Sequence, residues 1–161
     1  MPPISEFLRE QLELACREAD QLAQAERWLA AQPYSPSTAW TLRALRTFTV
    51  ESVFSGVERM LRVVVEEADG RVLRGGEWHA ALLREAAARS PNGRPPVIGA
   101  ETFELLDDLR RFRHVARHHY GLALDEDGIE ENVAVMRRLL PLLEADLRAF
   151  EAAMTGDAAP L

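Results

Sequence analysis

Apolar residues recur at steps of three and four along most of this chain, and this period constrains the fold more than any other feature. Such stripes cover residues 5–32, the stretch from Ser37 to Gly70, residues 100–119 and the segment after residue 127. This spacing puts apolar side chains on one face of an α-helix, whereas a strand would need alternation. The pattern therefore predicts four long amphipathic helices. Their expected buried residues are Leu8, Leu12, Ala15, Ala19, Leu22 and Leu29; Val50, Phe54, Val57, Leu61, Val64 and Ala68; Leu105, Leu109, Phe112 and Ala116; and Ile129, Val133, Met136, Leu140, Leu143, Leu147, Phe150 and Met154.

Residues that start or stop helices separate these stripes. Ser5 is predicted to cap the first helix, because a serine oxygen can accept from the free amides of the first turn. Two prolines and a serine in segment 32–36 end that helix. Gly70 and Gly121 are expected to close the second and fourth helices. A fifth, short helix is expected at residues 77–88.

The arrangement that buries four such stripes with short connections is an all-α, antiparallel up-and-down helix bundle, here of four long helices plus a short helix. The length of 161 residues suits one domain. This domain is predicted to span residues 1–154, followed by a flexible tail at 155–161. Pro141 lies inside the last helix and predicts a kink, because its ring collides with the carbonyl one turn back.

Composition restricts the class of protein. Hydrophobic residues make up 47% and charged residues 28%, an ordinary globular balance. The single cysteine, Cys16, excludes a disulfide scaffold, and we expect it to be a packed thiol. No apolar run is long enough to span a membrane, and the first residues do not resemble a secretion leader. These features favour a cytoplasmic protein without membrane association.

One short segment is strongly basic, although the net charge of the chain is -7. Residues 110–119 contain four arginines, three of the four histidines and no acid. Histidine exchanges protons near neutral pH, and arginine is a fixed donor to phosphate oxygens. Tyr120 adds a hydroxyl and a ring for stacking. Cleavage of RNA by its own 2′-hydroxyl needs a base, an acid and a cation at the phosphate, with no metal or other cofactor. The cluster therefore predicts a functional site.

The spacing within the cluster sets a geometric condition. Arg113 and His118 are five residues apart, about 140° around an ideal helix, so they do not project together. Convergence requires unwinding near Gly121, the long reach of arginine, or a second subunit related by a twofold axis. The same cluster of basic residues has two other interpretations. Basic residues in a last turn stabilise the helix dipole, and His114 with His118 could chelate zinc, although no further ligand has an obvious spacing.

The run Arg113-x4-His118-x-Tyr120 resembles the signature of HEPN-domain ribonucleases, specifically the HepT-like toxins. His114 departs from the family, in which asparagine is common at that position. The resemblance covers about residues 50–150, and the ordered set of segments is more specific than the short arginine–histidine element. The further segments are Trp78-His79-x-x-Leu82-Leu83, Arg94-Pro95-Pro96, the run from Leu109 to His114, and Tyr120-Gly121-x-x-Leu124-Asp125.

The resemblance implies a metal-independent endoribonuclease toxin that forms a homodimer with both motifs at a shared cleft. Arg113 would hold the scissile phosphate, and His118 would act in general acid–base catalysis. Tyr120 would position the RNA. The family also implies a minimal nucleotidyltransferase antitoxin that attaches AMP to Tyr120, where the added anion would compete for the arginines. Further contacts to RNA phosphates would come from His114, Arg117 and His119.

Two other classes of protein are compatible with these residues. A HEPN-like bundle could bind RNA or a nucleotide without cleaving it, and the net charge of -7 keeps this alternative to a nuclease open. An interaction protein could use its stripes only as core and interface. We interpret Trp78 as a core or loop anchor and His79 as a hydrogen-bonded structural histidine. Trp28 and Trp40 are expected in the core or an interface. Three side chains of the second helix could face the site but are left outside it: Glu51, Ser55 and Glu58.

Overall fold

The computed structural model describes residues 2–70, 72–118 and 125–156, without the side chains of residues 2–4 and 118. In this part of the chain there are five α-helices and no strand. Four of the helices are long and one is short, so the predicted all-α bundle is confirmed. The helices are α1 (Pro2–Ala30), α2 (Pro36–Asp69), α3 (Trp78–Ala87), α4 (Ala100–His118) and α5 (Glu126–Thr155).

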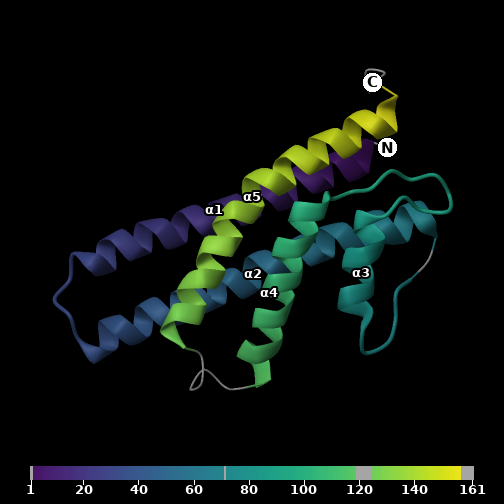
Figure 1. The fold of residues 1–161 in the computed structure, drawn as a ribbon. Helices are drawn as coiled ribbons and strands as arrows, with labels where there is room; N and C mark the ends of the chain where they lie inside the picture. The colour runs from purple at the N-terminus through teal and green to yellow at the C-terminus, as the bar shows by residue number, and fades with distance from the viewer. Residues whose placement is uncertain (1, 71, 119–124, 157–161) are drawn as a thin grey trace.

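The second helix is the centre of the bundle, because α2 packs against each of the other four helices. α1 and α2 form a long antiparallel hairpin, and the C-terminal half of α5 lies along α1 (Figure 1). α4 crosses α2 and contacts α3 on one side and α5 on the other. This arrangement holds the basic end of α4 between α3, α5 and the middle of α2.

A capping box starts α2. The Oγ of Ser35 accepts from the amide of Thr38 at 3.1 Å, and the Oγ1 of Thr38 accepts from the amide of Ser35 at 2.9 Å. These bonds satisfy two backbone donors at the helix start, and Pro36 occupies the first helical position. At the other end Gly70 is left-handed, with φ 63°, as predicted.

The start of α1 differs from the prediction. Ser5 does not cap this helix, because α1 begins at Pro2 and Ser5 lies inside it. A proline fits a first turn, where its missing amide has no helical partner. Asp125 caps α5 by accepting from the amide of Asp127 at 3.2 Å. Gly121 and residues 157–161 lie outside the described residues.

The predicted stripes belong to the core, with one exception, and further residues of α2, α3, α4, α5 and the loop before α4 join them. Met154, in the last turn of α5, is 38% exposed. Leu12 and Ala68 are half-buried, and the other stripe residues are buried. α5 contains Pro141 and changes direction along its length (Figure 1), as the proline predicts.

A buried ion pair fixes the end of α2 to the connection between α3 and α4. The side chain of Arg94 is 2% exposed, and it contacts Asp69 at 3.2 Å. Its Nη2 also donates to the carbonyl of Glu85 at 2.9 Å. These contacts give the Arg94-Pro95-Pro96 segment a structural role, because they hold the loop that leads into α4.

The tryptophans and the cysteine differ in burial. Trp28 and Trp40 are 64% and 65% exposed, so they are not core residues. Trp78 is half-buried and packs against the core, as predicted. Cys16 is also half-buried there, and burial is the main reason that the pKa of its thiol is raised. The thiol therefore stays protonated, as expected for a packed cysteine.

Candidate functional site

The basic end of α4 lines a pocket between α2, α3 and α4. Residues 110, 113, 114 and 117 are three and four apart, so they share one face of the helix. This face carries three arginines and a histidine. The pocket encloses about 340 Å³. Its lining residues are Phe54, Gly76, Glu77, His79, Ala80, Arg110, Arg113, His114 and Arg117.

Arg113 is the most enclosed arginine of this pocket, with its side chain 14% exposed. Its Nη1 donates to Glu58 Oε2 at 2.9 Å. Its guanidinium carbon lies 5.5 Å from the centre of the Phe54 ring, within the range of a cation–π contact. Its Nε is buried and has no hydrogen-bond partner among the described residues. A buried donor without a partner costs free energy, so a ligand oxygen that this N–H reached after a shift of the arginine side chain would be stabilised.

Glu58 joins two residues of the pocket through one carboxylate. It is 5% exposed on α2, and its two oxygens contact Arg113 and the Nδ1 of His79. Because an ionised carboxylate only accepts hydrogen bonds, Nδ1 carries the proton in this contact. The second ring nitrogen, Nε2, is then the one that exchanges protons. The His79 ring also stacks on Trp78, with ring centres 3.8 Å apart.

The other arginines of the pocket are held differently. Arg110 donates from Nε to Asp107 Oδ1 at 2.7 Å. Burial alone would raise the pKa of Asp107, but hydrogen bonds from two arginines outweigh it and leave this pKa below its ordinary value. Arg117 is more exposed, at 58%, and its Nε lies 3.8 Å from Glu51 Oε2. Arg117 is therefore the arginine most available to a phosphate outside the pocket.

The structure brings only part of the predicted cluster together. His118 is the last residue of α4, and its side chain lies outside the described residues. His119 and Tyr120 lie outside them as well. α4 stays helical to position 118, so its backbone positions 113 and 118 are about 140° apart. Unwinding therefore does not begin before residue 118. The predicted site residues that meet at the pocket are Arg113, His114 and Arg117.

Several residues at this pocket were not part of the predicted site, among them His79 of the lining and Glu58, which contacts both Arg113 and His79. Glu58 has a sequence signal, because it stands four residues after Phe54 and three before Leu61 and so lies on the apolar face of α2. A buried carboxylate needs a partner, and this position predicts one on another helix. His79 has no such signal, because the spacing along α3 does not show that it meets α2. Ser55 does not reach the pocket; it donates to the carbonyl of Glu51 at 2.8 Å.

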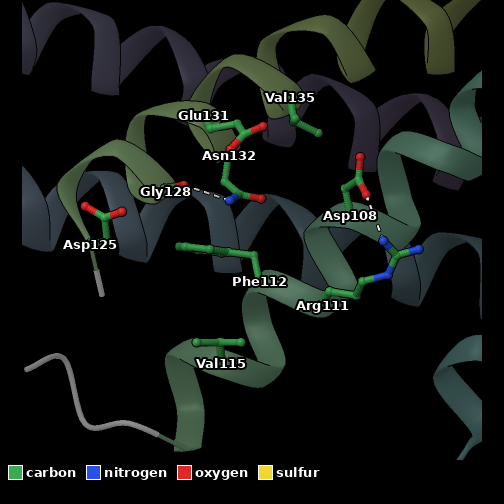
Figure 2. A pocket seen from close by; sticks show the side chains of 9 residues that line it. All are labelled: Asp108, Arg111, Phe112, Val115, Asp125, Gly128, Glu131, Asn132 and Val135. Carbon is green, nitrogen blue, oxygen red and sulfur yellow. Dashed lines mark hydrogen bonds and ion pairs between the residues drawn. The ribbon is translucent and has the colours of Figure 1, made fainter. Parts of the chain in front are cut away.

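A second pocket lies on the other side of α4, against the start of α5 (Figure 2). It encloses about 390 Å³, and Phe112 and Val115 of α4 form part of its apolar surface. Three carboxylates surround it and would repel the phosphates of a nucleic acid. The smaller pocket beside α3 is therefore the better candidate site. The three carboxylates are those of Asp108, Asp125 and Glu131.

In the described part of the chain, no three or more histidine, cysteine, aspartate or glutamate side chains come together in a way that could hold a metal ion. The zinc interpretation needs His118, whose side chain is not described, so it remains a prediction. Within the same residues, no helix has the length and apolar composition needed to cross a membrane.

The fold and the pocket together define a class: an all-α bundle with a buried arginine–glutamate pair at a pocket rich in arginine and histidine. Residues 45–154 match the family described as HepT-like protein, so the match covers more than half of the chain. The chain belongs to the HepT-like family, a HEPN-type toxin family, as its motifs predicted. No curated protein and no solved structure matches it.

Proposed function

We propose that this HepT-like protein is an endoribonuclease toxin that cleaves RNA without a metal, at the pocket between α2, α3 and α4. The observation that carries the proposal is the environment of Arg113. Its buried Nε has no partner in the described chain, and two further arginines line the same pocket. Guanidinium N–H groups are well suited to phosphate oxygens, and membership of the family supports ribonuclease activity.

In the proposed reaction the 2′-oxygen of RNA bonds to the adjacent phosphorus as the bond from phosphorus to the 5′-oxygen breaks. The products are a 2′,3′-cyclic phosphate and a 5′-hydroxyl, so one proton is removed and one is supplied. Arg113 stabilises the charge that develops on the phosphate, and His118 acts in proton transfer. The neighbouring phosphates and the chain of RNA are held by His114, Arg117, His119 and Tyr120.

The proposed active form is a homodimer. Positions 113 and 118 diverge around α4, so His118 of one copy would serve the site of the other across a twofold axis. An apolar patch beside the pocket suits this contact. Trp40 and Phe48 on α2 are 65% and 69% exposed, and Glu51, the partner of Arg117, follows on the same helix. Covering this patch with a second copy would bring two sites together.

The proposed partner is a minimal nucleotidyltransferase antitoxin. It would join the α-phosphorus of ATP to the hydroxyl oxygen of Tyr120, with loss of that proton and release of pyrophosphate. The attached AMP carries a negative charge at the end of α4. This charge would compete with RNA phosphate for Arg113 and Arg117, and would inactivate the toxin. Mass spectrometry of the two purified proteins with ATP tests this modification, with Tyr120→Phe as the control.

The test of the proposed function is incubation of total RNA with the wild type, Arg113→Ala and His118→Ala in EDTA. Arg148→Ala is a matched control, because this arginine of α5 is 76% exposed and pairs only with Glu144 in the described chain. We expect cleavage by the wild type and the control alone, with 2′,3′-cyclic phosphate ends. Intact RNA with wild-type protein that carries no AMP would instead favour a non-catalytic RNA-binding bundle. Cleavage that EDTA abolishes would contradict the metal-independent mechanism.

A further inference from the structure

We propose that His79 of α3, oriented by Glu58, is the proton donor to the leaving 5′-oxygen. This inference rests on the proposed ribonuclease function and adds to it a catalytic group from a different helix. One carboxylate holds Arg113 on one oxygen and His79 on the other. A phosphate bound to Arg113 would therefore lie next to the imidazole of His79.

His79 is both fixed and accessible. Its ring is held by Glu58 on one edge and by Trp78 on one face, and Arg62 lies 5.3 Å over the Trp78 ring. The side chain is nonetheless 34% exposed and lines the pocket. A ring that is immobilised but open to the pocket suits proton transfer to a bound ligand, because the donor is already in place.

The contact with Glu58 determines which nitrogen reacts. Nδ1 donates to the carboxylate, so Nε2 is the atom that gains and loses the exchangeable proton. The other charged or titratable side chains that line the pocket are Glu77 and, on α4, Arg110, Arg113, His114 and Arg117.

The reaction needs a group that donates a proton to the leaving 5′-oxygen, and His79 can be that group. A base removes the 2′-hydroxyl proton, the 2′-oxygen bonds to phosphorus, and the electron pair of the breaking bond remains on the 5′-oxygen. Nε2 of His79 gives its proton to that oxygen, and the neutral ring later regains a proton from water. The base and the acid are then different histidines, so His118 does not have to remove the one proton and also supply the other.

The test compares two RNA substrates that differ in one atom. One has an ordinary linkage at a single cleavage site, and the other has sulfur in place of the 5′-oxygen. A thiolate leaves without a proton, so the sulfur substrate does not need the acid. We expect His79→Gln to cleave the ordinary RNA at least ~100-fold more slowly than the wild type. On the sulfur substrate the two proteins should differ only a few-fold.

The glutamine variant keeps a side-chain N–H that can donate to Glu58, and circular dichroism and thermal melting check its fold. If it does not fold, His79→Ala with added imidazole replaces it, and the same difference between substrates is expected. Arg62→Ala is the control for a structural effect, because it loosens Trp78 and should alter both rates equally. Equal losses on both substrates, or no loss on ordinary RNA, would overturn the role of His79. A wild type that cleaves neither substrate would overturn the ribonuclease function itself, and this role with it.

Discussion

Arg113 of α4 donates to Glu58 of α2 at 2.9 Å, and the two side chains are only 14% and 7% exposed. Because both charges are largely removed from water, each depends on the other for its stability. The same carboxylate holds His79, so the contact that joins the helices also sets the geometry of the candidate site. Stability and activity should therefore change together when Glu58 is altered.

Glu58→Ala is expected to lower the free energy of unfolding by about 3–5 kcal/mol, because it leaves a buried guanidinium without its partner. Glu58→Gln should cost less, since the amide oxygen still accepts from Arg113. Urea unfolding followed by circular dichroism measures both. Glu144→Ala is the control: this glutamate is 45% exposed in an ion pair along α5, and its loss should cost less than about 1 kcal/mol. Equal costs for Glu58→Ala and Glu144→Ala would contradict the importance of burial.

Glu51→Gln is expected to tighten RNA binding a few-fold at low salt, because Arg117 loses the carboxylate that lies 3.8 Å away. Fluorescence anisotropy with labelled RNA measures the affinity, in a His118→Ala background that prevents cleavage. The gain should disappear at high salt, where exposed charges are screened. Glu13→Gln is the control, because it removes the same charge from α1, which does not pack against α4. An equal gain from both changes would mean that net charge, and not Arg117, determines the affinity.

Much of the fold could be predicted because burial on one face of a helix leaves a period in the sequence. The stripe through Leu105, Leu109 and Phe112 needed only that period, and all three residues are buried. The grouping of Arg113 with Arg117 could be predicted for the same reason, since residues four apart share a helix face. The spacing of residues within one helix was therefore sufficient to predict the buried stripe and the shared face of the two arginines.

The contacts between helices could not be predicted in the same way. Periodicity shows which face of a helix is apolar, but it does not show which partner covers it. Trp40 was thus equally compatible with core and interface, and only the packing shows that it is exposed. The contact between Glu58 and His79 joins residues 21 apart on two helices, and no spacing along either helix encodes it.

The double change Trp40→Glu/Phe48→Glu is expected to convert the proposed dimer into a folded monomer and to lower RNA cleavage. Both side chains are exposed, so charges there cost little in one chain but would repel each other across a twofold contact. Sedimentation equilibrium measures the association. Tyr34→Glu is the control, because Tyr34 is 86% exposed in the turn between α1 and α2. A wild type that is monomeric, or a double variant that stays dimeric, would exclude this patch as the interface.

The stability of the bundle should fall in acid partly through Glu26 of α1. Its carboxylate accepts from Arg46 of α2 at 2.8 Å and from Arg137 of α5, and Arg46 also donates to Glu130 at 2.9 Å. Burial alone would raise the pKa of Glu26, but the hydrogen bonds and charges of the two arginines outweigh it, so the pKa lies below its ordinary value. A carboxyl whose pKa is lower in the folded state contributes its full stability above the pKa of the unfolded chain, about 4.3. This contribution is lost as the pH falls through the lower pKa of the folded state.

Glu26→Gln should therefore lower the free energy of unfolding by about 1–3 kcal/mol at neutral pH, and by much less at a pH where Glu26 of the wild type is protonated. Urea unfolding between pH 7 and pH 2 measures the difference between the two proteins. The variant should still lose some stability in acid, because the pKa of Asp107 is lowered as well. Its slope against pH should be shallower than that of the wild type. A difference that stays constant over the whole range would show that Glu26 acts by packing and shape, and that its charge does not link the three helices.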